Sequence, residues 1–272
     1  MCAAPLKRSF VLVPLALVLI ACETTPTGRR QLQFFPDEQV AQMGVAAYAQ
    51  MRKQEKTVAA NEPVSRYVEC VAGAITAVVP TPKGGGKWEV TVFAGDQVNA
   101  FALPGGKIGV YTGLLKAAQT PAQLAAVIGH EIAHVQAEHA NARLSTQFAT
   151  EAGLALVAAV SEGRGESRTA MALLGLGAQV GILLPFSRSQ ESESDVLGLR
   201  YMAEAGFDPR ASVELWQNMA KVGGGGAPTF LSTHPSGERR IKDLNEAMPK
   251  ALETYNKARA AGRAPSCTPA PA

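Results

Sequence analysis

The chain has 272 residues, of which 47% are hydrophobic and 18% are charged, and its formal net charge at pH 7 is +3. A chain of this length can bury one substantial core, so we expect a single main domain. The small net charge and the lack of basic runs interleaved with aromatic residues argue against a nucleic-acid-binding protein.

The first 21 residues have the features of an export signal. Two basic residues precede the apolar run 10–20, which is too short to span a membrane comfortably. The run leads into Leu-Ile-Ala-Cys, which resembles a bacterial lipobox with Cys22 as the lipidated residue. The Glu that follows favours the outer membrane, by resemblance to lipoproteins that are not retained at the inner membrane. We therefore expect a signal peptide over 1–21 and a lipidated tether over 22–35, anchored at the periplasmic face of the outer membrane. A plain secretory signal with a chance cysteine is the alternative.

Two helices and a small sheet are expected after the tether. Residues 36–56 begin with a proline and two acids, which favour a helix start, and residues 63–79 carry apolar side chains at helical spacing. Residues 88–93 alternate between apolar and polar types. The apolar runs 99–103 and 107–111 flank Pro-Gly-Gly, which is a turn signal. These patterns predict a small antiparallel sheet.

The strand that begins at Asn99, Ala100 and Phe101 is a candidate for substrate binding. An extended peptide can add to the edge of a sheet through main-chain hydrogen bonds that do not depend on its sequence. A hairpin that only completes the core fits the same spacing, so both interpretations stay open.

The segment 123–140 carries an HExxH motif on a predicted helix. Positions four apart lie on one helix face, so His130 and His134 can offer imidazole nitrogens to the same ion. Glu131 lies beside them and is placed to accept a proton from a metal-bound water. Two histidines on a solvated helix face are the alternative interpretation.

A catalytic zinc normally has three protein ligands, and this motif supplies two. The chain has four histidines in all. The positions at which a metzincin would carry Gly and a third His hold Ala137 and Ala140, which excludes that class. A carboxylate on another helix is the most plausible third ligand. His139, five residues after His134, is expected to be turned off the metal face and to be structural or solvent-exposed.

Residues 187–198 read SRSQESESDVLG, and an HExxH followed by such an ExEAD-like segment resembles the family-48 metallopeptidases. The resemblance implies that Glu191 is the third zinc ligand and that Asp195 orients a ligand histidine. These two residues are four apart and share a helix face, whereas Glu193 points away. Ser194 replaces the usual Ala of the family.

The resemblance extends from about Thr27 to Lys250 and includes a His-Pro-x-x-x-x-Arg-Ile segment that starts at His234. It implies a mostly helical α+β fold of the gluzincin type over residues 36–261, with the small antiparallel sheet next to the HExxH helix and its edge along the substrate cleft. It also implies one Zn²⁺ per chain.

In the mechanism that this implies, zinc held by His130, His134 and Glu191 activates water, and Glu131 acts as the catalytic base. His234 has two alternative roles. It either donates a hydrogen bond to the oxyanion or binds zinc as a fourth ligand and holds the enzyme latent.

Further helices are expected along the second half of the chain. The apolar segments 153–160 and 170–186 are predicted to be core helices; a membrane-facing or substrate-covering helix is the alternative for the second. Helices are also expected over 190–205, 209–222 and 237–261, with Pro249 as a kink or break, followed by a disordered Pro/Ala-rich tail over 262–272.

Removal of the signal and lipidation of Cys22 would leave two cysteines, Cys70 and Cys267. In an oxidising compartment an even pair indicates a disulfide, here one that would tie the tail to the second helix. Two free thiols are the alternative.

These observations predict a zinc-dependent endopeptidase of the bacterial cell envelope, a lipoprotein protease in outer-membrane protein quality control. Its expected substrates are unfolded or misassembled envelope polypeptides, and the outer-membrane assembly machinery is a candidate partner. The alternative is a chaperone or assembly factor for outer-membrane proteins with secondary or latent protease activity. An intact Glu131 argues against a purely non-catalytic role.

Overall fold

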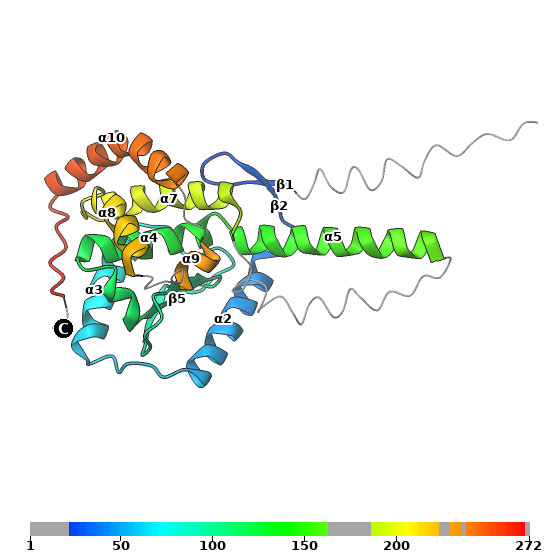
Figure 1. Ribbon diagram of the computed structural model, residues 1–272, viewed down its shortest axis with the longest axis horizontal. Helices are drawn as coiled ribbons and strands as arrows, with labels where there is room; N and C mark the ends of the chain where they lie inside the picture. Colours follow the sequence, from blue (N-terminus) through cyan, green and yellow to red (C-terminus); the bar gives the residue numbers. More distant parts are fainter. Residues whose placement is uncertain (1–21, 163–185, 223–228, 235–237, 270–272) are drawn as a thin grey trace, which may run out of the picture.

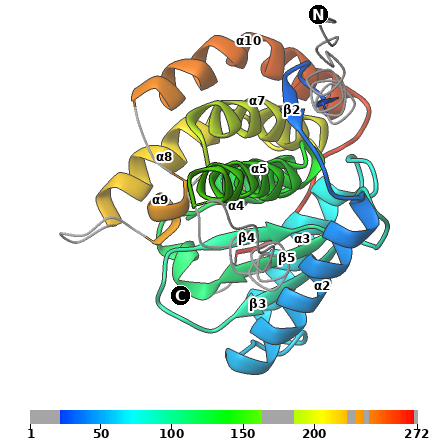
Figure 2. The same ribbon diagram turned by 90° about the vertical axis from the view of Figure 1, so that its right-hand side faces the viewer.

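The computed structural model describes residues 22–162, 186–222, 229–234 and 238–269. Its fold is mostly helical with small sheets, which confirms the predicted α+β class. Helix α4 (Pro121–Gln136), which carries the HExxH motif, lies between helix α7 (Arg188–Glu204) and a three-stranded sheet (Figure 2). Every residue of α4 from Gln123 onward is buried. A helix that is covered on all sides holds its polar side chains in a fixed environment, as a metal centre requires.

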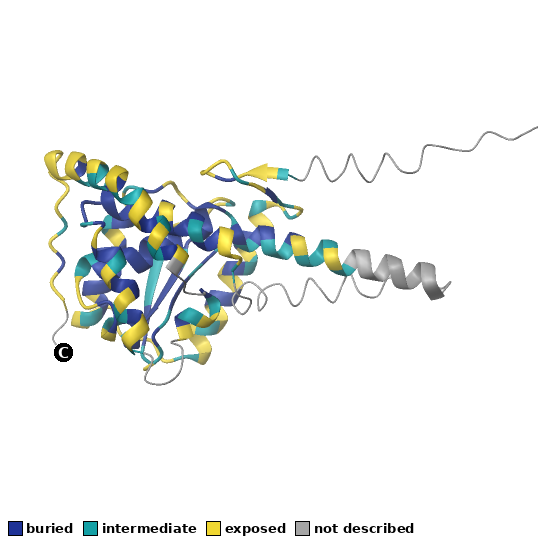
Figure 3. Ribbon diagram, turned by 45° about the horizontal axis from the view of Figure 1, so that its top comes forward, coloured by how far each residue is buried: buried dark blue, intermediate teal, exposed yellow. Residues whose placement is uncertain are grey.

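The other helices of the described residues surround α4 and α7. They are α2 (Asp37–Gln54), α3 (Pro63–Thr76), the short 3-10 helix η1 (Thr112–Lys116), α5 (His139–Glu162), α8 (Ala211–Val222), α9 (Thr229–Thr233) and α10 (Glu238–Ala260). Helix α5 projects away from the body of the molecule (Figure 1). In Figure 3 the buried residues gather on α4, α7 and the sheet, while α10 carries exposed residues on its outer side.

The three-stranded sheet has the order β3 (Glu89–Phe93), β5 (Lys107–Tyr111), β4 (Ala100–Leu103). The predicted β4–β5 hairpin is antiparallel, with Ala100 opposite Val110. Strand β3 differs from the expectation because it runs parallel to β5. The chain forms β4 before β5, and β5 then inserts between β3 and β4, which places β5 in the centre. Strand β4 is left at an edge of this sheet and packs against α4.

Two glycines allow α4 and α7 to approach closely. A Cβ atom on Gly129 would lie 2.9 Å from the carbonyl oxygen of Gly198, and a Cβ on Gly198 would lie 2.7 Å from the backbone nitrogen of His130. Real Cβ atoms essentially never come this close to backbone atoms. The crossing therefore requires glycine on both helices, and it brings the carboxylates of α7 next to His130.

The helix of the HExxH motif is shorter than the segment 123–140 suggests. It ends at Gln136, and Glu138 then adopts a φ of 55°, in the left-handed region. This reversal directs the chain into α5, which begins at His139. Positions after Glu138 therefore cannot be placed by extending the geometry of α4.

The segment expected to be a polar tether instead packs on the domain. Strands β1 (Cys22–Thr24) and β2 (Arg30–Leu32) form an antiparallel hairpin. Gln31 is buried, and its side-chain amide donates to the carbonyl of Ala137. Gln31 of this hairpin is thus a partner for a backbone carbonyl that directly follows the HExxH helix.

The C-terminal part of the chain also contacts the domain. Helix α10 continues through Pro249, where a kink or break was expected. Residues 261–269 form neither helix nor strand, and Cys267 forms a disulfide with Cys70 on α3. This bond fixes a tail that the sequence predicted to be disordered.

Helices of the described ranges lack the combined length and apolar composition that a bilayer-crossing segment needs. The signal peptide predicted over 1–21 and most of the apolar segment 170–186 lie outside the described residues.

Candidate metal centre

Four buried side chains from three helical elements meet at the centre of the molecule. They are His130 and His134 on α4, Glu191 on α7 and His234 at the end of α9, and one donor atom from each lies within 4.8 Å of all the others. The side chains are between 1% and 4% exposed. The structure thus brings the three predicted ligands together with His234, for which a role as a fourth ligand was one of two alternatives.

The spacing of these donors fits a zinc ion. Nε2 of His130 lies 3.1 Å from Nε2 of His134 and 3.3 Å from Nδ1 of His234. Oε1 of Glu191 lies 3.4 Å from Nε2 of His134 and 3.0 Å from Nδ1 of His234. Four ligands at tetrahedral angles and zinc distances of about 2.0–2.1 Å would be separated by about 3.3 Å. Three imidazoles and one carboxylate are also ligand types that zinc prefers.

The pKa shifts at the centre differ between its members. Burial favours the neutral form of Glu191, but hydrogen bonds from three histidines outweigh it and hold the pKa of this carboxyl far below its usual range. Burial likewise opposes a charged His130, but hydrogen bonds to Asp195 and Glu191 raise its pKa to about 9. The pKa of His134 is lowered well below the ordinary value, chiefly by burial. A bound cation would satisfy the same carboxylate and leave the imidazoles neutral.

Asp195 and Arg240 hold the ligands from behind. Nδ1 of His130 lies 3.0 Å from Oδ1 of Asp195, which directs Nε2 of the same ring toward the donor cluster. Arg240 donates from Nε and Nη2 to the two oxygens of Asp195, both at 2.7 Å, and its Nη1 lies 2.7 Å from Oε2 of Glu191. The indole of Trp216 lies 3.8 Å from the guanidinium carbon. Arg240 therefore fixes the candidate ligand Glu191 and also Asp195, which orients His130.

Sequence reasoning did not assign a role to Arg240. Its only signal was its place in the His-Pro-x-x-x-x-Arg-Ile segment, since an arginine at the start of a charged helix is normally solvated. The structure shows that Arg240 is 5% exposed and fully engaged.

Glu131 lies next to the donor cluster and against the edge strand. It is 2% exposed, and Oε1 lies 3.3 Å from Nε2 of His234. Burial raises its pKa, which the charges of His234 and His130 and a hydrogen bond from the backbone of Ala102 oppose. Ala102 belongs to β4, so the expected base and the expected substrate strand are adjacent.

Aromatic rings cover the centre on the side of His234. The imidazole of His234 is stacked between Phe230, at a centroid distance of 4.4 Å, and Phe186, at 5.0 Å. Phe186 also lies against His134, with ring centroids 3.7 Å apart. In this arrangement His234 occupies one side of the cluster and Phe186 shields it from solvent.

His139 lies outside the donor cluster, as expected, and it is buried rather than solvent-exposed. It is 0% exposed, and its Nδ1 lies 2.9 Å from Nδ1 of His134. Of the two alternatives left open, structural or solvent-exposed, the burial favours the first. The chain reverses at Glu138, so His139 is not one and a half turns further along α4. Glu193 points away from the donor cluster as expected, but it is buried and contacts His139.

The remaining predicted residues lie as follows. Ala100 and Phe101 are buried in β4, and Asn99 immediately precedes the strand and accepts a hydrogen bond from the backbone of Tyr111. Cys22 opens strand β1 and is partly exposed. Cys70 and Cys267 form a disulfide, and neither belongs to the donor cluster.

A pocket adjoins the centre beside β4. It is lined mainly by apolar atoms of α2, β4, the end of α4 and the start of α5, including Gly44, Leu103, His134 and Leu144, and Phe186 closes one side. The pocket thus connects the edge strand with a zinc-ligand candidate.

A mostly helical fold that presents HExxH histidines, a glutamate from a second helix and a buried acidic base defines a zinc metalloendopeptidase. The sequence profile of peptidase family M48 matches residues 45–248, and the chain belongs to this family. It uses one zinc ion, for which the donor cluster of the structure fits.

Curated relatives share this class. The chain is 36% identical over 213 residues to the mitochondrial metalloendopeptidase OMA1 of Schizosaccharomyces pombe, covering 77% of this chain and 61% of the relative. It is 41% identical over 175 residues to OMA1 of Arabidopsis thaliana, covering 64% and 34%. It is 25% identical over 251 residues to the metalloprotease LoiP of Escherichia coli, covering 89% and 97%. The chain thus spans between a third and two thirds of the length of these two OMA1 proteins.

The OMA1 relatives correct the expected biology. The predicted function in the bacterial cell envelope is contradicted by similarity to mitochondrial metalloendopeptidases of yeasts, plants and animals. The predicted location, lipid-anchored at the outer membrane, is contradicted by the same relatives. A lipobox-like tetrapeptide after an apolar run is a short signal, and similarity over most of the domain outweighs it. The coarser expectation, that the substrates are polypeptides, follows from the class of enzyme.

Proposed function

We propose that this chain is an OMA1-like endopeptidase that cleaves polypeptide segments bound in an extended conformation along β4. The observation that carries the proposal is the packing of the edge strand on the helix of the base: β4 contacts α4, and the backbone of Ala102 lowers the pKa of Glu131. A peptide added to β4 would bring its carbonyl carbon next to the carboxylate and the donor cluster. The mitochondrial names of the OMA1 relatives favour a mitochondrial setting.

In this proposal His130, His134 and Glu191 hold zinc, with Asp195 orienting His130. Zinc supplies Lewis acidity there, which lowers the pKa of water and polarises a carbonyl group. Glu131 accepts a proton on its carboxylate from the attacking water and delivers it to the nitrogen of the departing amine. Its raised pKa suits this exchange, since a base that must also donate works best when its pKa approaches the working pH.

The pocket beside β4 supports a preference for substrates with an apolar side chain next to the cleaved bond. Its lining is mainly apolar and reaches His134, so a side chain that enters it would lie close to the zinc ligands. The main-chain bonds of an added strand would be independent of sequence, whereas this pocket would supply the selectivity.

Cleavage of casein by wild type and by Glu131→Gln tests the activity. We expect the variant to lose at least about 10²-fold in rate, as for removal of a general base. Retained activity in a variant that is free of wild-type enzyme would contradict the role of Glu131. Zinc content measured on Glu191→Ala tests the ligand set in parallel, with Ser192→Ala on the same helix as the control. Glu191→Ala should lose zinc and Ser192→Ala should keep it.

The binding mode has a separate test. A peptide substrate is N-methylated at one residue at a time, and kcat/KM is measured for each. Alternate residues of an added strand bond to the edge, so every second N-methyl group should lower kcat/KM. A loss that does not alternate would contradict strand addition. Leu144→Phe, which narrows the pocket, should shift the preference toward smaller side chains, whereas Thr150→Phe on the exposed side of α5 should not.

A further inference from the structure

The two histidines of the HExxH motif are oriented by different partners. His130 contacts the carboxylate of Asp195 directly, with 3.0 Å between Nδ1 and Oδ1. His134 contacts another histidine, with 2.9 Å between its Nδ1 and Nδ1 of His139. Nε2 of His139 in turn lies 3.1 Å from Oε2 of Glu193. A metal-binding histidine normally donates its second ring N–H to a carboxylate, a carbonyl or a water, so this arrangement needs its own explanation.

We propose that His139 and Glu193 are positioning residues that fix His134 in the tautomer that binds zinc. An ionised carboxylate only accepts hydrogen bonds, so Glu193 requires the proton of His139 on Nε2. Nδ1 of His139 then carries a lone pair and accepts from Nδ1–H of His134. A neutral His134 with its proton on Nδ1 presents the lone pair of Nε2 to the donor cluster.

The opposite tautomers would prevent zinc binding. If His139 carried its proton on Nδ1, two lone pairs would face each other at Nε2 of His139 and Oε2 of Glu193. His134 would also have to carry its proton on Nε2, which points at Nε2 of His130 at 3.1 Å. Glu193 excludes this state, because its lone pair would face the lone pair on Nε2 of His139. The carboxylate thus acts on the metal site through two imidazole rings.

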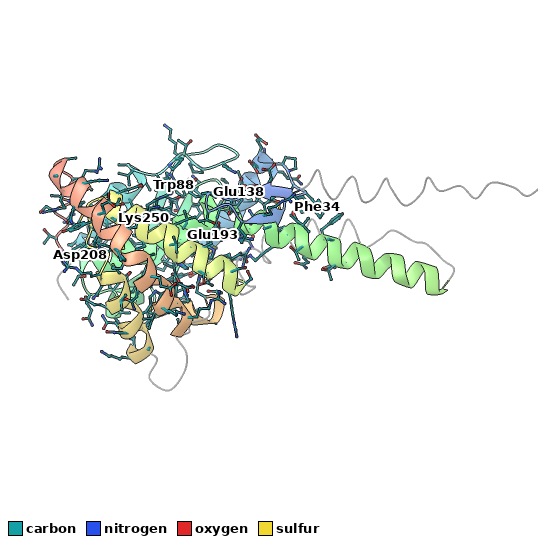
Figure 4. All side chains as sticks on the ribbon, turned by 90° about the horizontal axis from the view of Figure 1, so that it is seen from above. Phe34, Trp88, Glu138, Glu193, Asp208 and Lys250 are labelled. Carbon is teal, nitrogen blue, oxygen red and sulfur yellow. A yellow bond between two sulfur atoms is a disulfide. The ribbon has the colours of Figure 1, made fainter. Side chains whose placement is uncertain are left out.

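The N-terminal hairpin completes this arrangement. Arg29 donates from Nε to Oε2 of Glu193 at 2.7 Å, and the hydroxyl of Thr27 donates to Oε1. Glu193 therefore has two donors from the segment between β1 and β2 besides His139. Glu193, labelled in Figure 4, lies on α7. The hairpin fixes the carboxylate that fixes His139, so the N-terminal segment contributes to zinc binding from a distance.

The inference rests on His134 being a zinc ligand, and the two can be tested separately. His134→Ala should lose zinc under conditions in which the wild type keeps it. If His134→Ala retains the metal, the ligand assignment fails, and the role of His139 with it. If His134→Ala loses zinc, the measurements below test His139 and Glu193 alone.

The tautomers are read directly by histidine ¹⁵N NMR on the zinc-loaded wild type, which needs no variant that might misfold. We expect the proton of His134 on Nδ1 and the proton of His139 on Nε2. A proton on Nδ1 of His139 would overturn the proposal.

Zinc dissociation constants, measured by competition with a chelator, test the energetic consequence. His139→Phe keeps an aromatic ring but removes the acceptor, and we expect affinity to fall about 10–100-fold, as for other partners of metal-binding histidines. His139→Gln, which can accept and donate, should restore part of this loss. Glu193→Gln and Arg29→Met should weaken binding in smaller steps.

Ser145→Ala is the matched control. Ser145 is buried on α5, and it accepts from the backbone of Phe34 and donates to Asn141, but it does not contact Glu193. Its loss should lower stability while leaving zinc affinity unchanged. A folded His139→Phe that binds zinc as tightly as wild type would overturn the inference, and so would equal weakening by Ser145→Ala.

Discussion

Nδ1 of His234 lies 3.0 Å from Oε1 of Glu191, and Nε2 of the same ring lies 3.3 Å from Oε1 of Glu131. One imidazole thus bridges the proposed ligand and the proposed base. The position next to both is the one that an attacking water and a substrate carbonyl must share. The rings of Phe186 and Phe230 stack on the two faces of His234 and stabilise this placement.

We expect His234→Ala to raise peptidase activity, because it vacates the fourth donor position. If the closed arrangement holds about nine in ten molecules, its loss would increase kcat/KM about tenfold. Cleavage of a fluorogenic peptide by the variant and the wild type measures this. Ser232→Ala, on the exposed side of α9, is the control and should have no effect. A loss of about 10²–10³-fold would instead assign His234 to oxyanion stabilisation.

The pairing of Asp195 with Arg240 predicts a strong dependence of folding on the arginine. Both groups are buried and joined by two hydrogen bonds of 2.7 Å, so Arg240→Ala leaves two carboxylates without their cation. Breaking such a pair costs about 3–5 kcal/mol. Urea unfolding of the zinc-free protein should show this loss.

A double-mutant cycle checks that the loss belongs to the pair. Asp195→Asn in the Arg240→Ala background should cost less than in the wild type, because the charge it removes no longer has a partner. Additive effects would show that the two residues act independently. In the zinc-loaded protein, Asp195→Asn alone should weaken metal affinity about 10–100-fold.

The sequence predicted the part of the centre that local geometry determines. His130 and His134 lie on one helix face because they are four apart, and Glu191 and Asp195 share a face of α7 for the same reason. The mostly helical class and the β4–β5 hairpin also follow from local patterns.

The rest depends on contacts between distant segments. Arg240 reaches the centre because α10 packs on α7, and nothing in its neighbours along the chain indicates that it is buried. The contacts of His139 could not be foreseen, because a single residue in the left-handed region ends α4 just before it. Strand β3 was expected to be antiparallel but runs parallel to β5. The order of strands in space cannot be obtained from their order in the chain.

The disulfide between Cys70 and Cys267 joins residues 197 apart in sequence and ties the C-terminal segment to α3. A bond that closes so long a loop restricts the unfolded chain strongly, and removal of a native disulfide typically costs about 2–5 kcal/mol. We expect Cys70→Ala with Cys267→Ala to lower the urea midpoint by a corresponding amount. Zinc affinity should be unchanged, because neither cysteine contacts the donor cluster. Equal stability of the double variant and the wild type would show that the disulfide does not contribute to the free energy of unfolding.

The crossing of α4 and α7 gives the last prediction. Gly198→Ala would place a Cβ atom 2.7 Å from the backbone nitrogen of His130, so the two helices must separate by a fraction of an ångström. Overpacking of this kind costs about 1–3 kcal/mol. Because Glu191 lies on α7 and His130 on α4, the same displacement alters the spacing of the donors. We therefore expect both the free energy of unfolding and the zinc affinity to fall.

Gly73→Ala is the matched control for this substitution. Gly73 lies inside α3, is exposed, and has no heavy atom within 4 Å of an added Cβ. Alanine there should stabilise the protein by up to about 1 kcal/mol, because it favours the helix without a steric penalty. Urea unfolding and chelator competition on both variants separate the effects. If Gly198→Ala weakens zinc binding while Gly73→Ala does not, the close crossing positions the ligands. If Gly198→Ala is as stable as the wild type and binds zinc equally well, the crossing has room that the structure does not show.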